Sequence, residues 1–314
     1  MTSGRETRSP AQGRRVSPKV CERELRRRLV KARLDARGPD GVPRFTSRKA
    51  AAEALPWQTS TQDNLETGTG RVLPEHLDAI FDVFEIPEAE QPEWRWLADG
   101  AGGVGWWDAY GPEDLPPSSK DFIAYEAGAV RIRAFEPLIV HGVLQRPGYR
   151  EAVLRGASLT PRPDEQLQML MRVSQQRQQI LTGEHPVEFR ALLDEATLHR
   201  AVGPPDVMRD QLEHLADSAE DHGHLTVQVI PFDAGPHAGL GGSFSLFEFG
   251  WPDDAGFVYL ESGPDRTDYL EARSDIYLYS QVFDRLASLA FPPEASVEML
   301  RDVARRPGAR KARP

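Results

Sequence analysis

The feature that most constrains the fold is a pair of short helical segments between Ser47 and Gly68. Ser47 is a good N-cap residue, and the alanine-rich run that follows predicts a helix ending near Leu55. Pro56 makes a turn, after which a second helix is expected from Gln58 to Glu66. Gly68 can adopt the left-handed backbone conformation that ends many helices. Two short helices joined by a tight turn are typical of a helix-turn-helix.

Helical patterns also flank this pair on both sides. Residues 21–34 and 74–84 each place apolar side chains at the spacing of a buried helix stripe, and a short segment surrounds Trp94 and Trp96. A cluster of glycines between 100 and 105 then suggests a domain boundary. We therefore expect a helix-turn-helix domain over residues 19–98.

The remaining chain predicts a second domain over residues 104–305 that mixes helices and strands. Helices are expected at 119–136, 147–155, 164–182, 187–200, 205–219, 272–289 and 296–305. Strand-like runs at 225–232, 244–249 and 257–261 are separated by fairly short loops, which favours an antiparallel meander. The expected class is α+β: an all-α helix-turn-helix domain, then a mixed domain with several helices and a small antiparallel sheet.

The charge is unevenly distributed. The chain carries a formal net charge of −10, yet residues 1–50 hold 15 Lys/Arg and 5 Asp/Glu, and residues 301–314 hold 6 basic residues and 1 acidic residue. We expect a disordered basic arm over 1–18 and a basic tail over 306–314. Binding to DNA depends on local positive charge that displaces counterions from phosphates, so a basic arm on an acidic body favours a nucleic-acid partner.

Cysteine content and hydropathy narrow the class of protein. Cys21 is the single cysteine, so an internal disulfide and a thiolate zinc finger are excluded. No apolar run approaches the roughly 18 residues that a membrane helix needs, and no secretory signal is recognisable. These features predict a cytoplasmic, nucleoid-associated protein without a membrane partner.

The second helix of the pair offers side chains that can read bases. Gln58, Thr59, Ser60, Thr61, Gln62 and Asn64 are expected on its exposed face. Amide side chains can bond adenine through two atoms, and hydroxyls can reach bases or phosphates. Arg48 and Lys49 begin the first helix, where they are placed to contact phosphate. Double-stranded DNA is the expected partner, bound by a homodimer at half-sites one helical turn apart.

This stretch resembles the helix-turn-helix of lambda-repressor-like regulators of the xenobiotic-response-element type. The residues that carry the resemblance are Ala52, Leu55, Ser60, Leu65, Glu66 and Gly68. Arg48 falls where that family usually has a glutamine. Thr61 and Asn64 stand at its usual Lys/Arg positions, Asp63 adds a negative charge, and no Lys or Arg occurs between residues 50 and 70.

The larger domain resembles that of actinobacterial WhiJ-like regulators. The matching segments are Gly105-Trp106-Trp107, Phe135 to Gln145 with Tyr149, Arg177 to Leu181, Leu193 to Ala196, Val229 to Phe232, Gly242 to Phe244, and Phe283 to Leu286. His141 replaces a proline that is common there. The resemblance implies regulation of development or secondary metabolism, beside a small neighbour-encoded partner protein in an antitoxin-like pairing.

The larger domain offers polar candidates without a catalytic signature. Candidate ligand- or partner-binding residues are Trp106, Trp107, His141, Gln145, His237 and Ser243. Glu195 and His199 stand four residues apart and could pair as acid and base, although a surface pair is the simpler interpretation. His214 with Asp221, His222 and His224 could hold a metal, but a solvated loop is commoner. The glycine-rich loop 235–243 lacks the Lys and Ser/Thr of a phosphate-binding loop, and it could instead line a ligand or peptide cleft.

Three functional hypotheses remain open from the sequence. We expect a DNA-binding transcriptional regulator whose C-terminal domain binds a small partner protein or effector, with no catalytic residues, cofactor or metal. The first alternative is an antitoxin-like interaction module with a degenerate helix-turn-helix, because its recognition segment lacks basic residues. The second is an enzyme that uses the C-terminal domain, which would need Glu195, His199 or the 235–243 loop to converge in a pocket.

Overall fold

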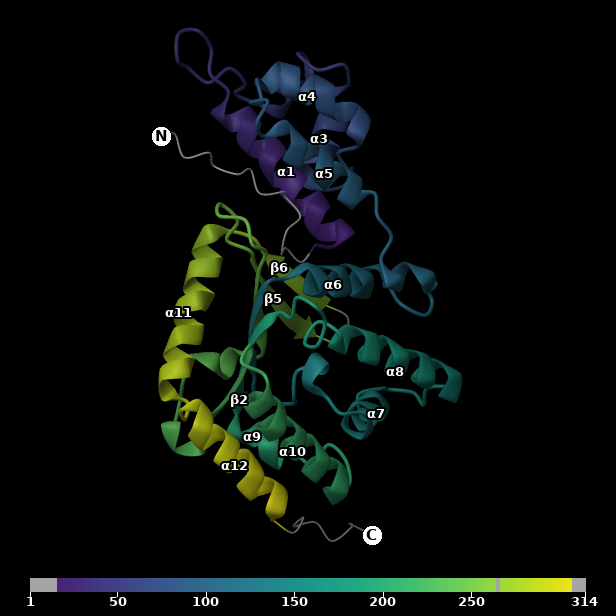
Figure 1. The fold of residues 1–314 in the computed structure, drawn as a ribbon, viewed down its shortest axis with the longest axis vertical. Helices are drawn as coiled ribbons and strands as arrows, with labels where there is room; N and C mark the ends of the chain where they lie inside the picture. Colours follow the sequence, from purple (N-terminus) through teal and green to yellow (C-terminus); the bar gives the residue numbers. More distant parts are fainter. Residues whose placement is uncertain (1–15, 264–265, 307–314) are drawn as a thin grey trace, which may run out of the picture. The chain divides into compact units, whose positions relative to one another are not determined.

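The chain divides into two compact units, residues 1–128 and 129–314 (Figure 1). The computed structural model describes residues 16–263 and 266–306. Most of the expected basic arm and basic tail therefore lies outside the described residues. At the inner end of the arm, Ser17 caps the first helix, since its Oγ accepts a hydrogen bond from the Val20 amide at 3.3 Å.

The first unit is helical, as predicted. Its helices are α1 (Pro18–Asp35), α2 (Arg48–Ala52), α3 (Thr59–Thr67), α4 (Leu77–Phe84), α5 (Gln91–Ala101) and α6 (Pro117–Gly128). Helix α1 packs against α3, α4, α5 and α6 and buries Leu25 and Leu29 completely. The predicted stripe of α4 is buried too, so periodic apolar side chains account for this core.

The division between the units lies later in the chain than the boundary expected near residue 100. Helix α6 belongs to the first unit because it packs on α1. Lys19 Nζ lies 3.4 Å from Asp121 Oδ1, and Ser17 Oγ donates to the Ala124 carbonyl at 2.5 Å. The backbone of Gly128 approaches Val20 so closely that a Cβ there would lie 2.6 Å from Val20 Cγ2.

The second unit contains a six-stranded mixed sheet in the order β3-β2-β1-β4-β5-β6. Its strands are β1 (Arg131–Glu136), β2 (Glu188–Asp194), β3 (Leu225–Ile230), β4 (Phe244–Glu248), β5 (Phe257–Gly263) and β6 (Arg266–Leu270). Strands β1, β2 and β3 are parallel, whereas β4, β5 and β6 continue the sheet antiparallel. The expected α+β class is confirmed.

Helices connect and cover these strands. They are α7 (Pro147–Gly156), α8 (Asp164–Gln178), α9 (Glu195–His199), α10 (Pro205–Asp221), α11 (Arg273–Leu289) and α12 (Pro293–Arg305). Figure 1 shows α11 on one side of the sheet and α7 and α8 on the other. Phe283 and Leu286 of α11 complete a core with Phe135, Leu192, Ile230, Phe244, Leu246 and Val258.

The structure corrects parts of two expected helices, and it also corrects the expected antiparallel meander. Residues 131–136 and 188–194 form β1 and β2 in the middle of the sheet, although both were expected to be helical. Ala134 and Phe135 of β1, and residues 191–193 of β2, are buried in succession because helices cover both faces there, so the alternation that identifies a half-exposed strand is incomplete. The 225–230 strand pairs in parallel with β2 at the far edge instead of joining β4 and β5 in a meander.

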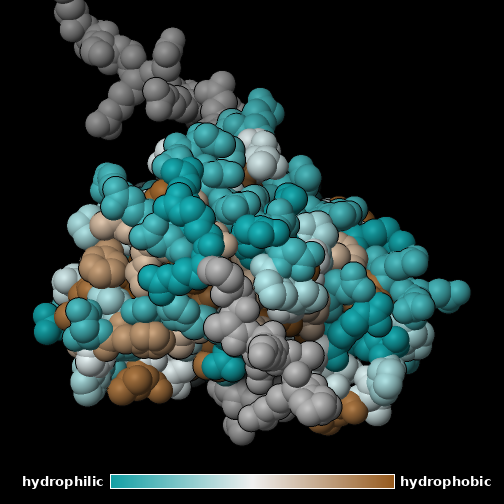
Figure 2. Space-filling model, turned by 90° about the horizontal axis from the view of Figure 1, so that it is seen from below, coloured by the Kyte–Doolittle hydropathy of each residue, from teal (hydrophilic) through white to brown (hydrophobic). Residues whose placement is uncertain are grey.

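The face in Figure 2 is mainly hydrophilic, with scattered hydrophobic side chains. Among the described helices, none is long and apolar enough to cross a bilayer.

Candidate nucleic-acid interface

The predicted pair of short helices is present as α2 and α3. Ser47 Oγ accepts a hydrogen bond from the Ala50 amide at 3.1 Å, so it caps α2 as expected. Gly68 ends α3 with φ +83°, a left-handed conformation that glycine adopts without strain. Ala51, Ala52, Leu55 and Leu65 are buried, which fixes the two helices to the core of the first unit.

One stripe of α3 faces solvent. Ser60, Asn64 and Thr67 are exposed and follow the i, i+4, i+7 spacing of a single helix face. Gln58 is also exposed at the N-cap position, whereas Thr59 and Thr61 are half-buried. We call Ser60, Asn64 and Thr67 the outward stripe. It consists of neutral polar side chains that can both donate and accept hydrogen bonds.

Gln62 corrects one expected position, because it does not belong to the exposed face. It is fully buried, with an exposed fraction of 0%. The Trp57 indole N–H donates to Gln62 Oε1 at 2.9 Å, and Gln62 Nε2 donates to Glu66 Oε1 at 2.8 Å. Gln62 lies on the side of α3 opposite the outward stripe, where it joins the helix to the turn before it.

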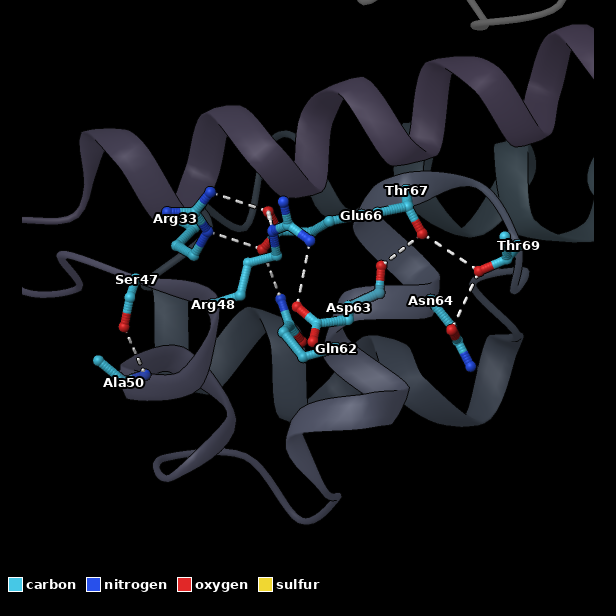
Figure 3. Close-up of polar contacts among 10 residues, drawn as sticks. All are labelled: Arg33, Ser47, Arg48, Ala50, Gln62, Asp63, Asn64, Glu66, Thr67 and Thr69. Atoms are coloured by element: carbon cyan, nitrogen blue, oxygen red, sulfur yellow. Dashed lines mark hydrogen bonds and ion pairs between the residues drawn. The ribbon is translucent and has the colours of Figure 1, made fainter.

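Glu66 is the centre of a buried polar network beneath α3 (Figure 3). Arg33 of α1 donates to both of its carboxylate oxygens, at 2.7 and 2.8 Å, and the Glu66 side chain is only 3% exposed. Such two-point pairs are strong and directional. The Glu66 expected from the sequence resemblance therefore has a structural role, and Arg33 was not predicted because it lies on a separate helix.

Arg48 connects the two helices at their surface. Its Nη1 donates to Asp63 Oδ1 of α3 at 3.1 Å, and its Nε lies 3.9 Å from Glu66 Oε2. Arg48 and Asp63 are both nearly half exposed. Lys49 is exposed, and no carboxylate of the described residues lies within ion-pair distance of it. Of the two expected phosphate contacts, Arg48 is thus paired with a carboxylate, whereas Lys49 is not.

Several arginines of α1 form ion pairs with acidic side chains of the same unit. Glu24, which is fully buried, accepts from Arg27 at 2.7 and 2.8 Å and from Arg28 at 2.6 Å. Arg28 in turn lies 3.0 Å from Glu93 of α5. A part of the positive charge counted in the sequence is therefore used to hold the helical unit together.

The other candidate residues are dispersed over the two units. Trp106 lies against Trp107 and Tyr110, with ring centroids 5.6 and 6.2 Å apart, and Trp107 is buried in the first unit. His141 and Gln145 are buried in the second unit. Burial and the nearby Arg177 charge lower the pKa of His141 to about 3, so its ring is neutral. Its Nδ1 accepts from the Val143 amide at 3.4 Å.

Gln145 ties together the segment after β1. Its Nε2 donates to the Val140 carbonyl at 2.6 Å, and its own carbonyl accepts from Gln178 Nε2 at 2.6 Å. Gln211 bridges the next residues, donating to the Leu144 carbonyl and accepting from the Arg146 amide. Gln145 and Gln211 therefore stabilise the fold of the second unit through buried hydrogen bonds.

His237 lies at the edge of the sheet where the parallel strands end. Its Nε2 is 3.3 Å from Asp194 Oδ2, and its Nδ1 accepts from the Gly239 amide at 3.2 Å. Both ring nitrogens are therefore occupied. Glu195 lies next to Asp194, and it is 3.2 Å from His199 and accepts from the Phe232 amide. Ser243 is half-buried at the start of β4, and no hydrogen bond joins it to either histidine.

The histidine cluster before β3 is arranged as part of a loop. His224 lies 2.8 Å from the Leu181 carbonyl, and its ring stacks on that of His222. Burial and the Arg146 charge lower the pKa of His214. Among the residues that the structure describes, no group of three His, Cys, Asp or Glu side chains could hold a metal ion.

Two threonines in this interface were missed by the sequence reasoning. Thr67 could have been found, because it continues the spacing of Ser60 and Asn64 along α3. Thr69 lies beyond the end of the helix, where periodicity gives no signal. Its Oγ is 3.0 Å from Asn64 Oδ1 and 3.1 Å from Thr67 Oγ1.

Comparison with known proteins places the second unit in a family. A family model described as a domain of unknown function (DUF5753) matches residues 119–302, more than half of the chain. No curated protein and no solved structure matches the chain.

Proposed function

Since this chain belongs to the family described as a domain of unknown function (DUF5753), we propose that it is a DNA-binding transcriptional regulator. In the proposal, the helical unit contacts double-stranded DNA through α2 and α3, and the DUF5753 unit binds a small partner protein or effector. DUF5753 occurs in the C-terminal regions of regulators of the xenobiotic-response-element type, which supports this assignment.

The observation that carries the proposal is the outward stripe of α3. A helix of a compact unit has to bury one face, and α3 does so with Gln62 and Leu65. Its opposite face presents a serine, an asparagine and a threonine, side chains that can bond base edges in the major groove. In the preceding helix, α2, Arg48 pairs with Asp63 of α3 and Lys49 is exposed, and in the proposal both contact phosphates.

Fluorescence anisotropy of a labelled duplex from the region upstream of the gene tests this function. We expect binding at low salt that weakens as salt is added, because phosphate contacts release counterions. Arg48→Gln should reduce the slope of log affinity against log salt by about 0.9, the value for one lost phosphate contact. Arg95→Gln is the matched control, since Arg95 is likewise exposed and paired with an aspartate, Asp78, at 2.8 Å. Absence of salt-dependent binding by the wild-type chain would contradict the proposal.

We further propose that the regulator acts as a homodimer. Helix-turn-helix dimers bind half-sites one helical turn apart, about 34 Å along the duplex. Light scattering coupled to size-exclusion chromatography should give a mass about twice the 35.1 kDa of the chain. Footprinting should show two protected segments with that spacing, and a monomeric mass with a single protected segment would contradict this.

One observation favours an alternative, an antitoxin-like interaction module that no longer binds DNA. The cations of this unit are extensively paired: Arg33 with Glu66, Arg48 with Asp63, and Arg28 with Glu24 and Glu93. A pull-down from cells that recovers a small neighbour-encoded protein, without enrichment of any DNA segment, would favour the module over the regulator.

A further inference from the structure

Asn64, in the middle of the outward stripe, is held in place by neighbouring side chains. Thr69 lies 3.0 Å from its amide group, and Thr67 lies 3.1 Å from Thr69 (Figure 3). Thr67 Oγ1 donates to the Asp63 carbonyl at 2.7 Å. The backbone of Gly70 also approaches Asn64, so that a Cβ there would lie 3.1 Å from Asn64 Cβ. We call Asn64, Thr69 and Thr67 the hydroxyl chain.

The protons of the hydroxyl chain can be counted. A threonine hydroxyl has one proton to donate. Thr67 uses its proton on the Asp63 carbonyl, since a carbonyl can only accept. The contact between the two hydroxyls therefore requires the Thr69 proton, which then cannot also be donated to Asn64.

Both contacts of Thr69, with Asn64 and with Thr67, can consequently be hydrogen bonds at the same time only if Asn64 is the donor. The oxygen and nitrogen of an amide side chain are assigned from their hydrogen-bond partners. With Nδ2 in place of Oδ1 beside Thr69, Asn64 donates to Thr69, Thr69 donates to Thr67, and Thr67 donates to the Asp63 carbonyl. All three contacts are then satisfied. With Oδ1 beside Thr69, one of the three has no proton.

We propose that the hydroxyl chain orients Asn64 to read an adenine in the major groove. With one N–H used on Thr69, Asn64 presents its carbonyl oxygen and its second N–H to solvent. An acceptor beside a donor matches the N6 amino group and N7 of adenine. In the opposite orientation the oxygen would still have one free lone pair, but the donor and the acceptor would exchange places, so the hydroxyl chain fixes which of them meets N6 and which meets N7. Thr67 and Thr69 are positioning residues in this proposal, which rests on the proposed function.

The test is a selection of binding sites from a randomised duplex library by the full-length chain. Wild type should enrich a motif with one position at which adenine is preferred on the order of tenfold or more. Asn64→Ala should abolish that preference and leave the other positions unchanged. Thr69→Val removes the hydroxyl at nearly constant volume and should reduce the preference about fivefold, as for one lost hydrogen bond. Thr69→Ser keeps the hydroxyl and should restore it.

Two controls separate reading of a base from loss of structure. Gln175→Ala removes an exposed amide of α8 in the second unit, far along the chain from the hydroxyl chain, so it should leave the adenine position intact. Replacing that adenine with 7-deazaadenine removes the N7 acceptor, and it should weaken binding by wild type but not by Asn64→Ala. The variants exchange neutral groups, so the salt dependence should stay constant.

Three results would overturn the inference. The first is a preference for guanine at the position that Asn64→Ala alters. The second is a motif that is the same for wild type and Asn64→Ala. The third is an adenine preference that is equal in wild type and Thr69→Val. Each leaves the proposed DNA-binding function standing, because wild type would still enrich a motif. If wild type enriches no sequence and no duplex, the proposed function fails and this inference fails with it.

Discussion

Among single residues, Asp63 has the clearest influence on the proposed interface. Its carboxylate pairs with Arg48 and lies on the flank of the outward stripe, so it both occupies a cation and repels phosphate. Exposed pairs contribute little to stability, about 0 to 1 kcal/mol, so this one can be changed without unfolding the unit. In the proposed interface, the ion pair between Arg48 and Asp63 therefore determines how much positive charge of α2 is available to phosphates.

Asp63→Asn should therefore strengthen DNA binding several-fold. The amide oxygen can still accept from Arg48, while the negative charge is gone, and the salt dependence should steepen by up to about 0.9 in log-log slope. Asp78→Asn is the matched control, because Asp78 is exposed and paired with Arg95 on other helices of the same unit. Anisotropy titrations at several salt concentrations measure both quantities. An equal effect of the two substitutions would show that only net charge matters.

His141 should make the stability of the second unit depend on pH. Its pKa is lowered from 6.5 to about 3 in the folded state, so the unfolded chain binds the extra proton between these values. Stability is therefore complete above about pH 6.5 and falls as the pH decreases toward 3. His141→Gln should flatten this dependence, measured as urea midpoints at pH 7.5 and 5. A wild-type midpoint independent of pH would contradict the assignment.

The helices and strands differ in how well sequence alone predicts them. Helices α7, α10 and α11 were predicted within about two residues, because amphipathic spacing records which face packs on the sheet. Strands β1 and β2 were missed. Ala191, Leu192 and Leu193 favour a helix locally, and only pairing with two neighbouring strands makes them extended. The helix caps Ser47 and Gly68 were predicted correctly because each meets a local need of the backbone: a hydrogen-bond acceptor at the start of a helix and a left-handed residue at its end.

In the candidate interface, the exposed positions followed from spacing, whereas the contacts did not. Asn64 and Ser60 were identified from their places along the helix. The burial of Gln62 depends on Trp57, which approaches it from the preceding turn, and the partner of Glu66 comes from α1. Periodicity describes one helix at a time, so it cannot reveal contacts made across helices.

The end of α3 offers a test at the level of the helix. Gly68→Ala should destabilise the first unit by about 1 kcal/mol or more, because φ is +83° there and the new Cβ would lie 2.2 Å from Arg26 Nη1. Gly111→Ala is the matched control in the same unit, since it lacks a positive φ and its Cβ would make only an ordinary contact. Thermal unfolding followed by circular dichroism measures both. Equal melting temperatures for the two variants would contradict the assigned role of Gly68.

For the whole molecule, the helical unit and the family domain share helix α6. The family match begins at residue 119, yet α6 packs on α1 through Lys19, Ser17 and Val20. Removing α6 would uncover this side of α1, including Val20, which is 1% exposed. Apolar surface of that kind costs about 25 cal/mol for each Å² returned to water. The boundary of a stable helical unit should therefore follow this packing and lie after Gly128.

Two fragments test this. A fragment of residues 1–128 should unfold cooperatively, whereas residues 1–101 should melt at a lower temperature, because Val20 loses its contact with Gly128. Cys21 lies beside Gly100 of α5, which both fragments retain, so its reaction with a thiol reagent reports how far the start of α1 opens when α6 is absent. Burial raises the pKa of this thiol to about 11, so its thiolate is scarce at neutral pH while α1 is covered. Cys21 should react slowly in residues 1–128 and faster in residues 1–101. If both fragments melt and react alike, α6 contributes nothing to the helical unit and serves the family domain alone.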